Sequence, residues 1–193
     1  MEHSESANTS MASAGADLFA RLQGYEQRSL AHDAGESDRQ QKISNWSGIA
    51  FRLRGHDLAC RIDAVEEIIA LPPWTPIPGT RDWLLGIANV RGNLVPISDL
   101  GGFLFGSPTA TTSRSRLLLT RFHSRLAGLI VDEVLGQRHF HTDDLEADEA
   151  WNDTALSGVV EDSFPMGERR WGVFHIERLG QLAEFMNGAR DEW

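Results

Sequence analysis

Two groups of side chains in this sequence have the types and spacing that could support chemistry, and the first is a pair of histidines. His139 and His141 stand at i and i+2, so they would share one face of a strand, and Asp143 and Asp144 follow closely. Two histidines and a carboxylate can hold Zn²⁺. No second histidine pair or cysteine cluster completes such a site. The pattern therefore predicts no metal and no cofactor, and a small metal-dependent enzyme using His139 and His141 is kept as an alternative.

The stretch 141–153 around these histidines is rich in carboxylates. It lacks the Asp-x-Asp-x-Asp-Gly order and the terminal Glu of a calcium-binding loop, so we expect a solvated surface loop. Trp151 is unusual in such a loop. We expect its ring either to fold back on the domain or to contact a partner.

The second group centres on Arg91, in the stretch Gly86-Ile87-Ala88-Asn89-Val90-Arg91-Gly92-Asn93-Leu94-Val95-Pro96-Ile97-Ser98-Asp99-Leu100. An arginine at a hairpin turn is most often solvated, but Glu66 or Glu67 is available as a partner. A paired, planar guanidinium would fix the shape of the turn and keep donors for another protein.

Catalytic motifs are missing from the sequence. It contains no Gly-x-Ser-x-Gly elbow, no glycine-rich phosphate loop and no Gly-x-Gly-x-x-Gly string. Serine, histidine and aspartate occur, but nothing local groups them as a catalytic set. The sequence thus favours a protein that is not an enzyme, either an interaction protein or a free-standing ligand-binding barrel.

Composition narrows the possible partners and the compartment. The 193 residues carry 28 acidic against 18 basic side chains, a net charge of −10, which disfavours nucleic acid and anionic lipid as partners. Cys60 is the one cysteine, so no intramolecular disulfide forms, and its place in an apolar/polar alternation with Ala59 and Arg61 predicts a buried strand residue. The acidic start has no signal-peptide pattern, and no run of about 20 apolar residues could insert into a membrane. We expect a cytoplasmic protein.

The elements that must position Arg91 follow from the same stretch. Gly92 and Asn93 tolerate positive φ, so we expect them to form the turn of a tight hairpin. Pro96 lacks an N–H donor, which predicts an edge strand. Asp99 can cap a short helix that runs through Phe105.

The rest of the chain reads as many short strands, which predicts a mainly β fold made of small barrels. The strands form two groups, 48–98 and 115–176, and two barrels this small should share a core. A helix is expected over 177–187, with Leu179, Leu182, Ala183 and Met186 on one face. Residues 46–188 would form the domain, preceded by a flexible extension over 1–45 that holds a short amphipathic helix between Ala16 and Ala31.

The stretch around Arg91 also resembles the signature of the CheW family, the scaffold adaptors of bacterial chemosensory arrays. The resemblance runs from about Ile49 to Leu182. Its landmarks are Val65-Glu66-Glu67-Ile68, Pro78-Gly79, Leu85 to Gly92, Val95-Pro96-Ile97-x-Asp99-Leu100 and Val131-Asp132-x-Val134. The entry at Trp46, the N-terminal helix and the Trp83 to Gly92 segment look closer to the twitching-motility branch, which serves type IV pili, than to a flagellar chemotaxis adaptor.

The resemblance implies a fold of two intertwined five-stranded SH3-like barrels and an adaptor without catalytic activity. Its partners would be the cytoplasmic tip of a chemoreceptor, held in the groove between the barrels, and the regulatory domain of a CheA-type histidine kinase, held at the barrel ends. Carried across by motif, the implied partner-binding residues are Val65, Glu67, Gly86, Asn89, Arg91 and Gly92. The acidic loop 141–153 and Gly101-Gly102 depart from the family pattern.

Overall fold

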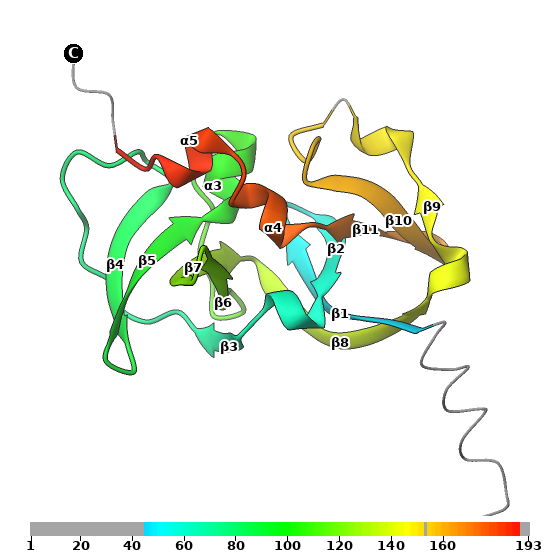
Figure 1. Cartoon of the computed structure of the whole chain (residues 1–193), viewed down its shortest axis with the longest axis horizontal. Coiled ribbons are helices and arrows are strands. Elements are labelled where there is room, and N and C mark those ends of the chain that lie inside the picture. Colours follow the sequence, from blue (N-terminus) through cyan, green and yellow to red (C-terminus); the bar gives the residue numbers. More distant parts are fainter. Residues whose placement is uncertain (1–44, 153, 190–193) are drawn as a thin grey trace, which may run out of the picture. The chain divides into compact units, whose positions relative to one another are not determined.

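The computed structural model describes residues 45–152 and 154–189 (Figure 1). The N-terminal extension and its expected helix lie outside these residues. The strands are β1 (Asn45–Leu53), β2 (His56–Arg61), β3 (Glu67–Ala70), β4 (Leu84–Val90), β5 (Asn93–Asp99), β6 (Arg116–Phe122), β7 (Arg125–Val131), β8 (Glu133–His141), β9 (Glu146–Ala147), β10 (Val160–Met166) and β11 (Arg169–Phe174). The helices are η1 (Ile62–Ala64), α3 (Leu100–Phe105), η2 (Thr142–Asp144), η3 (Glu149–Trp151), α4 (Ile176–Leu179) and α5 (Ala183–Met186). None of these described helices has the length and apolar character needed to span a bilayer.

The strands form two sheets, each curled into a small barrel (Figure 1). The first barrel has the strand order β8-β1-β2-β11-β10-β9, and the second has the order β3-β6-β7-β5-β4. The mainly β fold of two intertwined barrels is therefore confirmed. The first sheet has six strands where five were expected, because the two-residue β9 adds to β10.

The division of the strands into two consecutive groups was wrong. β1 and β2 come first in the chain but pair with β8 and β11 of the C-terminal half. Two parallel contacts, β2 with β11 and β5 with β7, join segments far apart in sequence. Alternation along a strand shows which face is buried but does not identify the neighbouring strand.

Three buried clusters explain the near-continuous apolar runs. Leu117 and Leu119 point into the second barrel, whereas Leu118 between them joins a cluster shared by both barrels. Likewise Phe51 belongs to the shared cluster and Ala50 to the interior of the first barrel. Strands buried on both faces carry apolar residues at every position. The expected shared core is thus confirmed.

α3 begins where the sequence predicted. Asp99 is its N-cap and accepts a hydrogen bond from the Gly102 N–H at 2.8 Å, and the helix ends at Phe105 before Gly106, whose φ is 69°. The same carboxylate accepts hydrogen bonds from the Thr109 N–H at 2.7 Å and the Thr109 hydroxyl at 2.5 Å. Asp99 therefore fixes both the helix and the loop that follows it.

The expected C-terminal helix is two short helices instead of one. α4 ends at Leu179 and α5 starts at Ala183, with Leu182 between them in an extended conformation. This break lets Phe185 pack against Trp83, Phe103 and Phe122. Leu182 and Met186 stay partly exposed, so the predicted apolar face was only partly right.

Pro96 corrects another expectation, because β5 is an interior strand between β7 and β4. However, β5 pairs with β7 only from Ile97 onward. Pro96 lies just before that pairing starts. Its missing N–H therefore breaks no hydrogen bond to β7, and the proline marks the point where the two strands separate.

Two other sequence interpretations concern single side chains. Cys60 is fully buried, as expected, and burial raises the pKa of its thiol to about 12. Trp151 folds back on the domain: its Nε1–H donates to the Ser163 hydroxyl at 2.8 Å, and that hydroxyl donates to Asp148 at 2.8 Å. The acidic loop is thereby tied to β10, although its outer carboxylates remain exposed.

Candidate functional site

The turn between β4 and β5 has two residues, Arg91 and Gly92, because Val90 pairs with Asn93. Their φ angles are 52° and 85°. Both central residues of this hairpin type need positive φ, so the expectation that Gly92 and Asn93 form the turn was shifted by one residue. The Asn89 Oδ1 accepts a hydrogen bond from the Gly92 N–H at 2.8 Å, which stabilises the turn.

Arg91 is held by Glu67. Arg91 Nη2 lies 2.6 Å from Glu67 Oε1, with 76% of the arginine side chain and 31% of the glutamate side chain exposed. Glu67 begins β3, which lies at one edge of the second sheet, and Arg91 follows β4 at the other edge. The ion pair therefore joins the two edges of the curled sheet and leaves other guanidinium donors facing solvent.

Glu66, the alternative partner left open by the sequence, pairs with Arg121 of β6 instead. Arg121 Nε lies 2.8 Å from Glu66 Oε1. Glu67 is the first residue of β3 and Glu66 lies in the bend just before it, and the two carboxylates reach different neighbours. Of the two candidates, Glu67 is therefore the partner of Arg91.

Val65 and Gly86 lie close by but have a different setting. Val65 is half-buried and packs against the shared core. Gly86 has a φ of 149°, and a Cβ there would collide with the carbonyl oxygen of Thr75. Thr75 forms a two-way backbone bridge with Ile87, at 2.8 and 2.9 Å. Val65 and Gly86 therefore pack within the fold, whereas Arg91 and Gly92 form the turn and Glu67 and Asn89 hold it.

Leu94 is a residue that the sequence reasoning missed. Its side chain is 74% exposed, the largest fraction among the exposed large apolar residues of the described chain, and it pairs across the hairpin with Asn89. Val95 beside it is fully buried. Alternation along β5 could have predicted that one of these two neighbours faces solvent beside Arg91.

The histidine pair lies on β8, where His139 and His141 are exposed on either side of the buried Phe140. His139 Nδ1 is 2.8 Å from the Ser47 hydroxyl. Within residues 45–152 and 154–189, no group of three or more His, Cys, Asp and Glu side chains comes together in a way that could hold a metal ion. The geometry lends no support to a metal-dependent active site.

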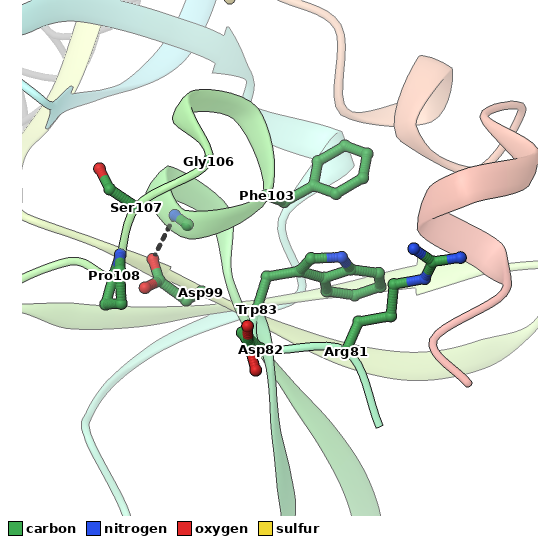
Figure 2. A pocket seen from close by; sticks show the side chains of 9 residues that line it. Arg81, Asp82, Trp83, Asp99, Phe103, Gly106, Ser107 and Pro108 are labelled. Atoms are coloured by element: carbon green, nitrogen blue, oxygen red, sulfur yellow. Dashed lines mark hydrogen bonds between the residues drawn. The ribbon is translucent and has the colours of Figure 1, made fainter. Parts of the chain in front are cut away.

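A hollow of about 450 Å³ lies beside α3, and Figure 2 shows the side chains that line it. The Trp83 ring and Phe103 lie on one side, and Asp99 lies on the other. Asp99 is 3% exposed and its carboxylate accepts the three hydrogen bonds already described. The buried carboxylate of this hollow therefore holds the fold, and no chemistry is assigned to the hollow.

Comparison with known proteins identifies the family. The sequence profile of the CheW-like domain matches residues 47–184. The chain belongs to the CheW-like family. At the level of the family, these proteins are scaffolds and adaptors, not enzymes, and they act in chemotaxis signalling.

Several relatives refine this placement within the CheW-like family. The chain is 35% identical to the protein PilI of Pseudomonas aeruginosa over 171 residues, which cover 89% of this chain and 96% of PilI. It is 31% identical to FrzA of Myxococcus xanthus over 58% of this chain and 72% of FrzA. It is also 36% identical to the chemotaxis protein CheW of Rhizobium meliloti over 45% of this chain and 56% of that protein.

A solved structure supports the fold of this CheW-like chain. The scaffolding protein TtCheW from Thermoanaerobacter tengcongensis superposes with a TM-score of 0.63 at 21% identity, over 72% of this chain and 89% of TtCheW. The predicted family, and its PilI-like branch, are therefore confirmed.

Proposed function

We propose that this CheW-like protein couples the cytoplasmic tip of a methyl-accepting chemoreceptor to the regulatory domain of a CheA-type histidine kinase. The system it serves would control twitching motility by type IV pili, since PilI matches almost the whole chain. The protein would act in the cytoplasm, at receptor arrays on the inner membrane. Residues 46–188 would form the adaptor domain and residues 1–45 an extension.

The observation that carries the proposal is the Arg91 turn. Arg91 lies at positive φ in a turn that the Asn89 side chain stabilises through the Gly92 N–H, and a 2.6 Å ion pair holds its side chain, which is 76% exposed. A planar guanidinium held this way can donate paired hydrogen bonds to a partner at little entropic cost. The Leu94 side chain beside it supplies exposed apolar surface.

Charge gives further support for a protein partner. The net charge of −10 opposes binding to phosphate backbones and anionic lipid headgroups. A site that combines one guanidinium, one carboxylate and one leucine resembles the mixed centre of a protein interface. The partner-binding residues proposed are Val65, Glu67, Gly86, Asn89, Arg91 and Gly92, of which Glu67, Asn89, Arg91 and Gly92 form or hold the turn.

The test is a titration of the full-length protein with two purified fragments, the regulatory domain of the CheA-type kinase and the cytoplasmic fragment of the receptor. Arg91→Ala should weaken binding to one of them by at least about tenfold, because an arginine at the centre of an interface often contributes about 2 kcal/mol or more. Glu67→Ala should weaken the same complex. The double variant should lose less than the sum of the two.

Arg61→Ala is the matched control. Arg61 forms an exposed ion pair with Asp63 at 2.7 Å, but it lies at the end of β2 in the first barrel. Its loss should leave both titrations unchanged. If Arg91→Ala is folded and binds both fragments as tightly as the unaltered protein, the assignment of the Arg91 turn is wrong.

A further inference from the structure

A mainly apolar cavity of about 480 Å³ lies between α5 and the strands β4, β5 and β7 (Figure 1). Its lining includes Trp83, Ser98, Phe122, Arg125 and Phe185. Trp83 is the one lining residue that it shares with the hollow of Figure 2. We refer to it as the α5 cavity. Its size and its mixture of aromatic rings with a few polar groups are typical of sites that bind small molecules.

Three aromatic rings give the α5 cavity a fixed apolar wall. The rings of Trp83 and Phe185 stack with 5.3 Å between their centroids and 14° between their planes. The ring of Phe122 meets Phe185 edge-on, with 5.5 Å between centroids. Each ring is held by its neighbours before a ligand arrives. An aromatic ligand could therefore pack against this wall at a small entropic cost.

Ser98 places an unused polar group in the α5 cavity. Along β5, Val95 and Ile97 fill the interior of the second barrel, so Pro96 and Ser98 point out of the barrel and line the cavity. Ser98 is 4% exposed, and within residues 45–152 and 154–189 its hydroxyl has no hydrogen-bond partner. A buried hydroxyl without a partner is unfavourable, and a ligand with a hydrogen-bonding group would satisfy it.

Arg125 supplies a positive charge to the same cavity. It begins β7, and its exposed side chain forms no hydrogen bond or ion pair with any other residue that the structure describes. No aspartate or glutamate lines the cavity to neutralise it. Ser98 pairs with Leu129, which lies four residues beyond Arg125 on β7. Four residues of strand span about 13 Å, so the backbone positions of the two polar residues are separated by roughly the length of a small aromatic acid.

We propose that the α5 cavity binds a small aromatic carboxylate that carries a hydroxyl group on the far side of its ring. The carboxylate accepts hydrogen bonds from the Arg125 guanidinium, which can donate two in parallel. The ring packs against Trp83, Phe122 and Phe185. The ring hydroxyl forms a hydrogen bond with the Ser98 hydroxyl, which removes the unfavourable burial of that group.

The α5 cavity is separate from the Arg91 turn, because no residue of that turn lines it. The ligand site therefore goes beyond the adaptor function and does not depend on it. The net charge of −10 does not exclude an anionic ligand here. Exposed charges more than about 8 Å away are largely screened at physiological ionic strength, so the nearby arginine dominates.

The experiment titrates 3-(4-hydroxyphenyl)propanoate into the full-length protein and follows binding by calorimetry. A ligand of about 12 non-hydrogen atoms should bind with a Kd of about 1 mM or lower. Arg125→Ala alters an exposed side chain, so the variant should fold normally, and it should bind about tenfold more weakly. Arg114→Ala is the matched control, because Arg114 is 72% exposed and does not line the cavity. Its Kd should stay within about twofold of that of the unaltered protein.

Two analogues of the probe separate the two polar contacts. The neutral amide, 3-(4-hydroxyphenyl)propanamide, should bind the unaltered protein and Arg125→Ala equally, because it has no charge for the arginine to pair with. 3-Phenylpropanoate lacks the ring hydroxyl and should bind the unaltered protein about fivefold more weakly than the hydroxylated probe does. Ser98→Ala should bind the two carboxylates equally, because the hydroxyl that distinguishes them is gone.

Several outcomes would overturn the proposal. The first is absence of binding by the unaltered protein at a probe concentration of about 10 mM. The second is an equal affinity of the unaltered protein and Arg125→Ala for the hydroxylated carboxylate. Equal affinity of the unaltered protein for the two carboxylates would overturn the Ser98 contact. If the probe binds only after deletion of residues 190–193, the occupant of the cavity is that segment of the chain and not a small molecule.

Discussion

Replacement of Arg91 separates the contribution of the side chain from that of its backbone. The Arg91→Ala variant removes the ion pair with Glu67, in which the arginine is 76% exposed. Exposed pairs contribute about 0–1 kcal/mol to the free energy of unfolding. Alanine keeps a Cβ at a φ of 52°, so the backbone strain of the turn is unchanged. For a domain of this size, the melting temperature should fall by less than about 4 °C.

The Arg91→Gly variant removes the same ion pair and also the Cβ. Glycine has no Cβ and adopts the left-handed conformation more easily, which adds about 1 kcal/mol to the free energy of unfolding. This gain offsets the loss of the ion pair. Arg91→Gly should therefore be as stable as the unaltered protein or slightly more stable, and more stable than Arg91→Ala. Binding should be impaired equally in both variants, because both lack the guanidinium.

Urea unfolding followed by tryptophan fluorescence gives the free energies, since the chain contains six tryptophans. The reasoning makes two separable claims. A loss above about 2 kcal/mol in Arg91→Ala would show that the arginine belongs to the fold, because an exposed pair cannot contribute so much. A glycine variant less stable than the alanine variant would refute the assigned turn conformation.

Three further predictions concern the rest of the chain. Cys60, buried and with its pKa raised to about 12, should not react with a thiol reagent at pH 8 until the protein is unfolded, and rapid labelling of the native protein would contradict its burial. Burial opposes ionisation of Asp148, but hydrogen bonds from Ser163 and Arg170 outweigh it and hold the pKa of that carboxyl below its ordinary value. The stability this provides is complete above the ordinary pKa and is lost as the pH falls through the lowered one, so Asp148→Asn should cost about 1–3 kcal/mol at pH 7 and flatten the acid dependence seen by urea unfolding. Deletion of residues 1–44, which are mostly polar, should leave the melting temperature within about a few degrees, and a large drop would place the Leu18 and Leu22 face in the core.

Local features of the fold could be predicted because each depends on few residues. Asp99 caps α3 because its side chain lies three residues before an N–H that needs an acceptor. The alternation of Leu117, Leu118 and Leu119 between two cores is visible as a continuous apolar run, which indicates burial on both faces. The sequence therefore predicted small barrels with a shared core.

The strand partners could not be predicted from the residues alone. The parallel contacts of β2 with β11 and of β5 with β7 depend on crossovers, and no side chain in either strand specifies them. The family resemblance supplied the intertwined arrangement. The turn was predicted one residue too late for a similar reason. Either Arg91 or Asn93 could form a two-residue turn with Gly92, and only the pairing of Val90 with Asn93 decides for Arg91.

At the candidate site, too, the sequence identified the residues but not how they pair. The sequence named Arg91 and offered two adjacent glutamates, but the structure uses both, with Glu67 on Arg91 and Glu66 on Arg121. Glu67 begins β3 and Glu66 lies in the bend just before it, so the two carboxylates reach different arginines. Sequence reasoning had treated the glutamates as alternatives for one arginine, and so it missed the ion pair between Glu66 and Arg121.

The chain entering β3 contacts the supports of two turns: Glu67 pairs with Arg91 of the β4–β5 turn, and Glu66 pairs with Arg121, which donates to the Ser124 carbonyl oxygen in the β6–β7 turn. Glu66 and Glu67 are adjacent, so a displacement of the start of β3 would move Arg91 and the Arg121-supported Ser124 together. Neither ion pair needs to contribute much to stability for this to matter, because each orients a turn whose backbone already lies at positive φ. These exposed ion pairs therefore contribute little to the free energy of unfolding, but they fix the positions of the groups that a partner would contact.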